Sequence, residues 1–273
     1  MLVTRSPRPV LRAFVRTLWA SDQTGATFSP AADRERVLPT GMMHLVVRLS
    51  DHPIRLFNGI DDAEGTTVGW AVVGGARASS YEKDISRPVR AVGAQLYPGV
   101  SQLLFGAPAD KLAGRHTLLC DLWGSPADEM REQLGEAGSL DRELDLFESI
   151  LAARLPAVRG LHPAVAHALY RFGQTDQVRE VVSETGYSHR RFVEVFRRAV
   201  GLKPKIFCRI TRFQKTLVGL ALLPGSSYAA LAIDSGYSDQ AHFNREFREF
   251  AGLSPGQYRD ASPLFPNHVP VRS

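Results

Sequence analysis

The sequence contains one motif twice, and this repeat constrains the fold more than any other feature. The second copy, 227–259, reads SYAALAIDSGYSDQAHFNREFREFAGLSPGQYR, and the first, 178–201, reads VREVVSETGYSHRRFVEVFRRAVG. A Gly-Tyr-Ser triplet, two phenylalanines four residues apart, a glycine and a proline recur in the same order, at Gly186 to Pro204 and at Gly236 to Pro255. A register shared at this many positions indicates two copies of one supersecondary unit.

Each copy has the signals of two helices joined by a tight turn. In the second copy we expect a helix over about 228–235 that ends at Gly236, because glycine takes the left-handed backbone conformation without steric cost. Ser238 suits the N-cap of the next helix, where Asp239 favours the positive end of the helix dipole. Phe243 and Phe247 begin an apolar stripe that leaves the opposite face polar and basic. This pattern predicts two helix-turn-helix units.

The outer faces of the two second helices supply the candidate DNA-binding residues. They are Arg190, Val193, Glu194 and Arg197 in the first unit and Gln240, Ala241, His242, Asn244 and Arg245 in the second. Arginine can bind guanine with two hydrogen bonds, amides suit adenine, glutamate can accept from cytosine, and methyl groups can pack on thymine. The alternative is two ordinary solvated faces, but their occurrence in matched motifs favours DNA binding.

At these residues the chain resembles the AraC/XylS family of bacterial transcription regulators, over roughly 160–260. The family signature is matched by Leu231, Ala232, Gly236, Tyr237, Asp239, Gln240, Phe243, Arg245, Phe247, Gly252, Pro255, Tyr258 and Arg259. The resemblance implies a regulator that binds double-stranded DNA and contacts RNA polymerase, without enzymatic activity. Glu194 departs from the pattern, because many members carry a basic or amide side chain there, so the base preference of the first unit is expected to differ.

Charge is concentrated in the half that carries the repeat. The chain of 273 residues has a net charge of +5, and residues 160–273 hold 15 Lys and Arg against 9 Asp and Glu. A basic domain joined to a nearly neutral one suits a polyanionic partner at one end. We read no signal peptide and no membrane-spanning run, and the two cysteines, Cys120 and Cys208, fit a reducing cytoplasm.

The first half predicts a small antiparallel β-barrel with helices. Short β-favouring runs at 44–49, 54–57, 66–73, 78–81 and 89–97 are separated by glycine and proline. We expect a short helix within 1–20 and further helices at about 126–135 and 141–155. The last is amphipathic, and its apolar face either packs on its own barrel or forms a homodimer contact. The fold class is therefore α+β with two domains.

The domain limits follow from the breakers and the repeat. We expect a sensor or assembly domain over 1–157, a DNA-binding domain over 160–262, and a disordered proline-containing tail over 263–273. A linker is predicted between Pro156 and Gly160. Within the second domain, Pro204 should open a long helix to about Leu222 that acts as a rigid spacer, with Arg209, Arg212 and Lys215 away from its apolar stripe.

The first half also resembles a companion domain of AraC-type DNA-binding domains. The resemblance rests on Leu18-Trp19, Leu38-Pro39-Thr40-Gly41, Tyr97-Pro98-Gly99, and Leu119 with Leu122-Trp123-Gly124. It implies a barrel related to the family's sugar-sensing barrels, and so a possible small-molecule effector. Trp70, Tyr81 and Tyr97 are the candidate ligand-binding residues, although small barrels are often filled by their own side chains.

An enzymatic function is the alternative class. The histidines of the first half, His44, His52 and His116, lack the spacing of a metal site, and no nucleotide-binding or hydrolase motif occurs, so we expect no metal and no cofactor. Cys120 could be a reactive thiol in an enzyme or alkyl-acceptor barrel with accessory DNA binding. Its neighbours Leu118 and Leu119 favour instead a cysteine in the core.

Overall fold

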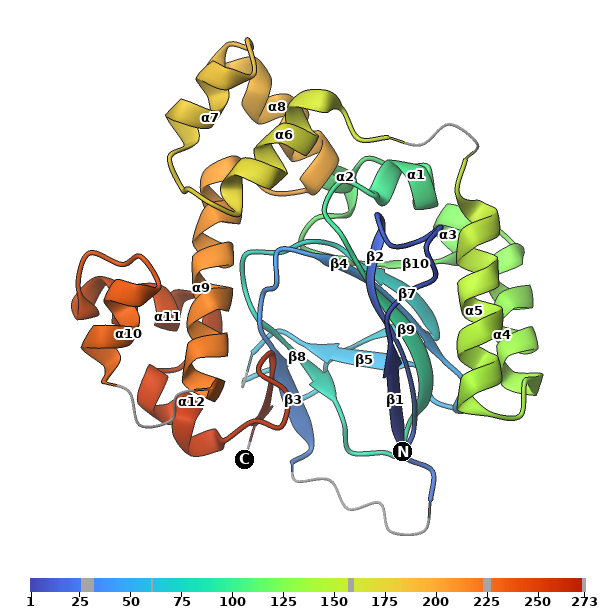
Figure 1. Cartoon of the computed structure of the whole chain (residues 1–273). Helices are drawn as coiled ribbons and strands as arrows, with labels where there is room; N and C mark the ends of the chain where they lie inside the picture. Colours follow the sequence, from blue (N-terminus) through green and yellow to red (C-terminus); the bar gives the residue numbers. More distant parts are fainter. Residues whose placement is uncertain (26–31, 60, 157–159, 223–226, 272–273) are drawn as a thin grey trace.

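A computed structural model describes residues 1–25, 32–59, 61–156, 160–222 and 227–271 (Figure 1). The first half is built from antiparallel sheets with helices, and the second half is helical, as the fold class predicts. The middle of the predicted linker, 157–159, lies outside the described residues.

The N-terminal half contains two antiparallel sheets that do not close into the predicted small antiparallel β-barrel. The six-stranded sheet has the order β1-β2-β9-β4-β7-β10, and the five-stranded sheet has the order β11-β3-β8-β5-β6. The first consists of β1 (Leu2–Arg5), β2 (Val15–Asp22), β9 (Arg90–Leu96), β4 (Met43–Arg48), β7 (Ala71–Gly74) and β10 (His116–Leu118). The second consists of β11 (His268–Val271), β3 (Arg34–Val37), β8 (Tyr81–Asp84), β5 (Ile54–Phe57) and β6 (Thr66–Gly69).

The predicted helix within 1–20 is wrong. Residues 2–5 form β1, a turn follows, and 15–22 form β2, which pairs with β1 and with β9. Leu11 and Phe14 lie in the turn, and Val15 and Leu18 lie on β2. All four side chains are buried, so their spacing resembles that of a helix although no helix is present there. Along β2 the period is two, with Leu18 and Ala20 buried on one face.

Five helices follow in the N-terminal half. They are α1 (Ser101–Phe105), α2 (Ala109–Leu112), α3 (Cys120–Trp123), α4 (Pro126–Glu136) and α5 (Leu140–Arg154). Helix α5 buries Leu144, Phe147 and Leu151 against β2, β9 and neighbouring helices. Its apolar face therefore packs on its own domain, which is the first of the two alternatives for this helix. Arg5 of β1 forms ion pairs with two carboxylates of α5, at 2.9 Å from Asp145 and 3.0 Å from Glu148.

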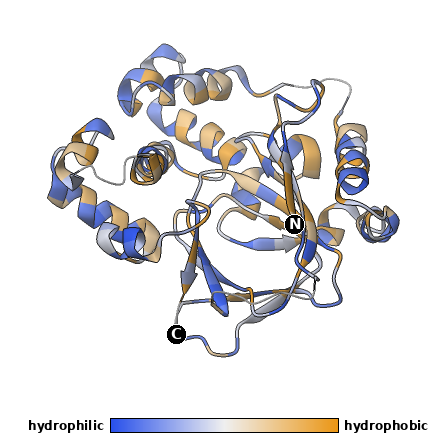
Figure 2. Ribbon diagram, turned by 60° about the horizontal axis from the view of Figure 1, so that its bottom comes forward, coloured by the Kyte–Doolittle hydropathy of each residue, from blue (hydrophilic) through white to orange (hydrophobic). Residues whose placement is uncertain are grey.

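In the described part of the C-terminal half there are seven helices, the fourth of which is the longest. They are α6 (Pro163–Phe172), α7 (Val178–Glu184), α8 (His189–Val200), α9 (Pro204–Leu222), α10 (Tyr228–Asp234), α11 (Gln240–Ala251) and α12 (Pro255–Ala261). Helices α7 and α8 are the first predicted unit, and α10 and α11 the second, so both predictions are confirmed. Figure 2 shows hydrophobic and hydrophilic residues mixed along these helices, as expected of helices with one buried face.

Helix α9 gives the two units a shared core, because its start and its middle pack on different partners. Near its start, the ring of Phe207 lies 5.7 Å from that of Phe196 in α8. Further along, Phe213 lies 5.3 Å from both Phe247 and Phe250 of α11. Edge-to-face and tilted aromatic contacts of this kind add to the stabilisation that comes from burying apolar surface. The predicted spacer helix is thus also the element on which both units fold.

The C-terminal tail returns to the N-terminal half, so the prediction that 263–273 is disordered is wrong for 263–271. Strand β11 pairs antiparallel with β3, from His268 opposite Val37 to Val271 opposite Arg34. Val269 is buried, and the hydroxyl of Tyr258 in α12 donates to the carbonyl of Pro266. The chain therefore passes from the sheets to the helices and then back to the sheets.

Candidate nucleic-acid interface

The two recognition helices, α8 and α11, begin with side-chain caps of different kinds. The hydroxyl of Ser188 accepts from the backbone N–H of Arg191 at 3.4 Å. In the second unit the cap is Asp239, whose carboxylate accepts from the N–H of His242 at 2.7 Å, so the expected cap at Ser238 is wrong by one residue. That hydrogen bond lowers the pKa of Asp239, and the carboxylate also accepts from the hydroxyl of Ser238.

The outer face of α8 is exposed and mostly basic. The side chain of Arg190 is 92% exposed, those of Glu194 and Arg197 are each 52% exposed, and Val193 is half-buried. Glu194 lies 3.6 Å from Arg190 and 3.5 Å from Arg191, so its charge is partly balanced within the helix. The face can still present arginine side chains to an anionic partner.

The outer face of α11 is exposed at three of its five candidate positions. Gln240, Ala241 and Arg245 are exposed, whereas His242 and Asn244 are half-buried. The imidazole Nδ1 of His242 lies 3.1 Å from the hydroxyl of Ser238, which anchors the ring at the start of the helix. Of the five candidates on α11, Gln240, Ala241 and Arg245 are thus the most accessible to a partner such as a DNA groove.

The structure therefore groups the nine candidate residues into two sets, one on each recognition helix. Figure 1 shows the first unit at the start of α9 and the second unit beside the rest of that helix. The two sets differ in chemistry, since the first contains arginines and a glutamate and the second contains amides, a methyl group, an imidazole and one arginine.

Both units also contact the N-terminal half, which the sequence patterns did not predict. Arg197 of α8 lies 3.4 Å from Asp110 of α2. Gly201 ends α8 with a φ of +88°, and a Cβ there would come within 3.1 Å of the carbonyl oxygen of Ala109. Glycine is therefore required both by the backbone conformation and by the close approach of α2.

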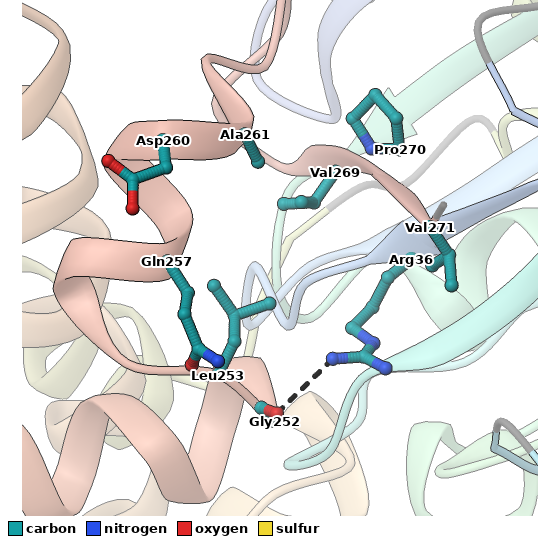
Figure 3. Close-up of a pocket in the computed structure, with 9 residues that line it drawn as sticks. All are labelled: Arg36, Gly252, Leu253, Gln257, Asp260, Ala261, Val269, Pro270 and Val271. Carbon is teal, nitrogen blue, oxygen red and sulfur yellow. Dashed lines mark hydrogen bonds between the residues drawn. The ribbon is translucent and has the colours of Figure 1, made fainter. Parts of the chain in front are cut away.

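The second unit rests against the sheet that contains β11. Arg36 of β3 donates to the carbonyl oxygens of Ala251 and Gly252, both at 3.3 Å, at the end of α11. Figure 3 shows the hydrogen bond to Gly252. A cavity of about 440 Å³ lies beside this contact, between α12, the end of α11 and β11. Nearby, Gln214 of α9 donates to Pro39 and to Asn267, each at 2.8 Å.

The three candidate ligand-binding aromatics lie in different surroundings. The ring of Trp70 is 40% exposed and lies under the guanidinium of Arg131. Tyr81 stacks edge-on against His116, with ring centroids 4.7 Å apart. Tyr97 is 38% exposed and lines a cleft next to the C-terminal half. No shared ligand site is formed by these three rings in the described structure.

Tyr81 belongs to a half-buried polar group with side chains from both sheets. Arg77 stacks on its ring and also approaches His116, whose ring packs against that of His44. Burial, followed by the charge of Arg77, lowers the pKa of His44 to about 3. Burial, with His44 and Arg77 nearby, lowers the pKa of His116 to about 2. Both imidazoles are therefore neutral at physiological pH.

The cleft that Tyr97 lines has a volume of about 530 Å³ and separates the N-terminal half from α6 and α9. Arg12 and Arg16 contribute charge on one side, and Leu169, Phe172 and Phe207 contribute apolar surface on the other. Neither Trp70 nor Tyr81 lines it. A molecule in this cleft would touch both halves of the chain.

Cys120 is exposed at the start of α3, so the expectation that it lies in the core is wrong. Its neighbour Leu119 is buried instead, because the short helix turns the cysteine outward. Cys208 is the buried cysteine, and burial raises its pKa to about 12. Within the described ranges, no helix has the length and hydropathy to cross a membrane, and no cluster of His, Cys, Asp or Glu could hold a metal.

Two family models match the chain. Residues 181–261 match a family described as a helix-turn-helix domain, and residues 3–118 match one described as a domain of unknown function (DUF6597). The first match covers α8 to α12 with the end of α7, and the second covers all strands of the two sheets except β11.

Individual relatives match the same C-terminal region. An uncharacterized HTH-type transcriptional regulator of Haemophilus influenzae is 32% identical over 77 residues, which is 28% of this chain and 26% of that protein. The HTH-type transcriptional regulator MtrA of Neisseria gonorrhoeae is 31% identical over 80 residues, 29% of this chain and 26% of that protein. The matches thus span about a quarter of the length of these relatives.

Among solved structures, ToxT of Vibrio cholerae aligns with a TM-score of 0.45 and 9% identity, over 89% of this chain and 98% of that one. The sequence matches and the two observed units both indicate that the helical half contains a helix-turn-helix domain. Residues 181–261 form a helix-turn-helix domain.

Proposed function

We propose that this protein is a sequence-specific, DNA-binding transcription regulator of the bacterial cytoplasm. The observation that carries the proposal is the pair of exposed recognition helices, α8 and α11, held on one spacer helix. Each is suited to a major groove, and the two together to adjacent segments of one duplex. Control of transcription would follow from contact with RNA polymerase at a bound site.

The test is selection of duplexes from a random pool by the full-length protein, followed by binding at increasing salt. We expect one enriched sequence and an affinity that falls steeply with salt, because the arginines neutralise phosphates and release counterions. A protein that enriches no sequence and whose binding is insensitive to salt would overturn the proposal. An otherwise identical protein with Arg190 and Arg245 changed to Ala serves as the control for the selection.

We also propose that a small effector acts through the cleft between the two halves. Its volume of about 530 Å³ is in the usual range for ligand sites, and its walls combine apolar side chains with Arg12 and Arg16. An apolar molecule with a negative charge fits this chemistry. The check is a thermal-shift screen of such molecules, in which Arg16→Ala should abolish a shift seen with the unmodified protein.

We propose that one protomer suffices to bind DNA, and homodimer formation is tested separately. Because α5 buries its apolar face in its own domain, a dimer would have to use another surface. Sedimentation velocity, with and without a selected duplex, measures this directly. A single protomer on one asymmetric site is the arrangement that the tandem units favour.

A further inference from the structure

One arginine of the spacer helix is held by both helix-turn-helix units. Arg212 lies in α9, and its Nη1 donates to the Oδ2 of Asp176 at 3.1 Å. Its Nε and Nη2 donate to the carboxylate of Glu246 at 3.2 and 3.0 Å. Asp176 lies just before α7 in the first unit, and Glu246 lies in α11, the second recognition helix. A single guanidinium therefore connects the two units.

The connection is strongest on the side of the second unit. The side chain of Glu246 is 2% exposed and that of Arg212 is 14% exposed, whereas Asp176 is 48% exposed. Burial alone would lower the pKa of Arg212, but the hydrogen bonds and charge of Glu246 outweigh it and raise that pKa. The guanidinium therefore stays charged, and two parallel hydrogen bonds fix its direction as well as its distance.

The position of Glu246 links this ion pair to DNA reading. Glu246 follows Arg245, the candidate base-reading arginine, and precedes Phe247, whose ring packs on Phe213 of α9. Aromatic contacts hold α11 close to α9, but they tolerate small rotations of a helix. A directed, charged hydrogen bond does not, so rotation of α11 would separate Glu246 from Arg212 as it moved Arg245.

Arg209 provides a matched comparison one turn earlier in α9. Its Nε donates to Glu246 at 2.7 Å, and its Nη2 donates to Glu249. Both carboxylates belong to α11, so these contacts anchor the second unit to the spacer. Arg212 shares the anchor on Glu246 but adds the contact with Asp176 in the first unit.

We propose that Arg212 is a positioning residue that fixes the orientation of the second recognition helix relative to the first unit, and so sets the spacing of the two DNA segments. This inference rests on the proposed function. Asp176 and Glu246 are its two partners, one in each unit. The distance between the segments is then a property of the protein and not only of the operator.

The experiment measures binding to a panel of duplexes in which the selected site has base pairs inserted or removed between its two segments. The unmodified protein should prefer one spacing strongly. Arg212→Gln and Asp176→Asn should reduce that preference about three- to tenfold, which is the range expected for coupled contacts in one network. Arg209→Gln should weaken binding by a similar factor at every spacing.

Asp176→Asn is the variant least expected to unfold the protein. It weakens the contact of Arg212 with the first unit but leaves buried Glu246 paired with both Arg209 and Arg212. Melting curves of each variant accompany the binding data. Equal weakening at all spacings by both Arg212→Gln and Asp176→Asn would overturn the positioning role while leaving the proposed function intact. An unmodified protein that binds no two-segment duplex would overturn both.

Discussion

Arg197 in the first recognition helix lies 3.4 Å from Asp110 in helix α2 of the N-terminal half. The candidate DNA-contacting arginine and the carboxylate are both partly exposed, so the pair contributes at most about 1 kcal/mol. Binding of DNA at this position has to take Arg197 away from Asp110 and bring phosphates near a negative charge. We therefore expect the N-terminal half to oppose DNA binding by the first unit.

Replacing that carboxylate should strengthen DNA binding. Asp110→Asn is expected to raise affinity for a selected duplex by up to about fivefold, because it removes both the competition and the repulsion. Fluorescence anisotropy measures the change, with Asp141→Asn on the exposed side of α5 as a control of equal charge. An affinity that is unchanged or lower with Asp110→Asn, relative to that control, would show that Asp110 does not oppose DNA.

The tail strand should stabilise the whole molecule. Ending the chain after residue 262 removes β11, exposes the edge of β3 and deletes buried Val269. We expect the free energy of unfolding to fall by about 2–4 kcal/mol, since a buried side chain and a ladder of hydrogen bonds are lost. Urea titration checks this, and ending the chain after Val271 is the control, which should behave as the full chain. Equal stability of the two truncated proteins would contradict the role of β11.

Mild acid should destabilise the N-terminal half through His44 and His116. Their folded pKa values, about 3 and about 2, lie below the ordinary value near 6.5. As the pH falls below about 6.5, the unfolded chain binds protons that the folded chain does not. Stability is therefore full above that pH and is lost below it, by up to roughly 1.4 kcal/mol per pH unit for each histidine.

The measurement is the free energy of unfolding in urea at a series of pH values from about 7 to 5. His116→Gln should lessen the dependence on pH in this interval, whereas substitution of exposed His189 should leave it unchanged. A variant with the full dependence would mean that His116 takes up its proton without unfolding.

The helical half was predictable because its signals are local. The turn glycines and the paired phenylalanines act within one unit of the chain, and the structure places them as expected. The β-runs at 54–57 and 89–97 were likewise close to β5 and β9. The hydrophobic periodicity and the helix- or strand-breaking residues are enough to predict an element when that element depends mainly on its own residues.

The errors arose where distant parts of the chain decide the outcome. Strand β11 contains Pro270 and is only four residues long, and it exists because β3 offers an unpaired edge more than two hundred residues away. The bridge from Asp176 through Arg212 to Glu246 also joins three separate elements, and no periodicity within one helix predicts it. Whether two sheets close into a barrel depends in the same way on pairing between distant strands.

The arginines of α11 should separate by role. Arg245 is exposed one turn after Ala241 on the predicted reading face, so Arg245→Ala should cost roughly 1–3 kcal/mol and relax the preference at one base pair. Arg248 is exposed nearer the end of the helix, and Arg248→Ala should weaken all sequences about equally. Binding of each variant to all single-base changes of a selected site distinguishes the two. If Arg245→Ala weakens every site by the same factor, Arg245 contacts the phosphate backbone.

We propose that one chain reads DNA with two unlike recognition helices. Base-by-base substitution of a selected site, combined with a hydroxyl-radical footprint of the full-length protein, tests it most directly. We predict two protected segments of different sequence, centred about 10 bp apart on one face of the duplex, with one protomer bound. A palindromic site that needs two protomers, or a single short segment read by one helix, would contradict the claim.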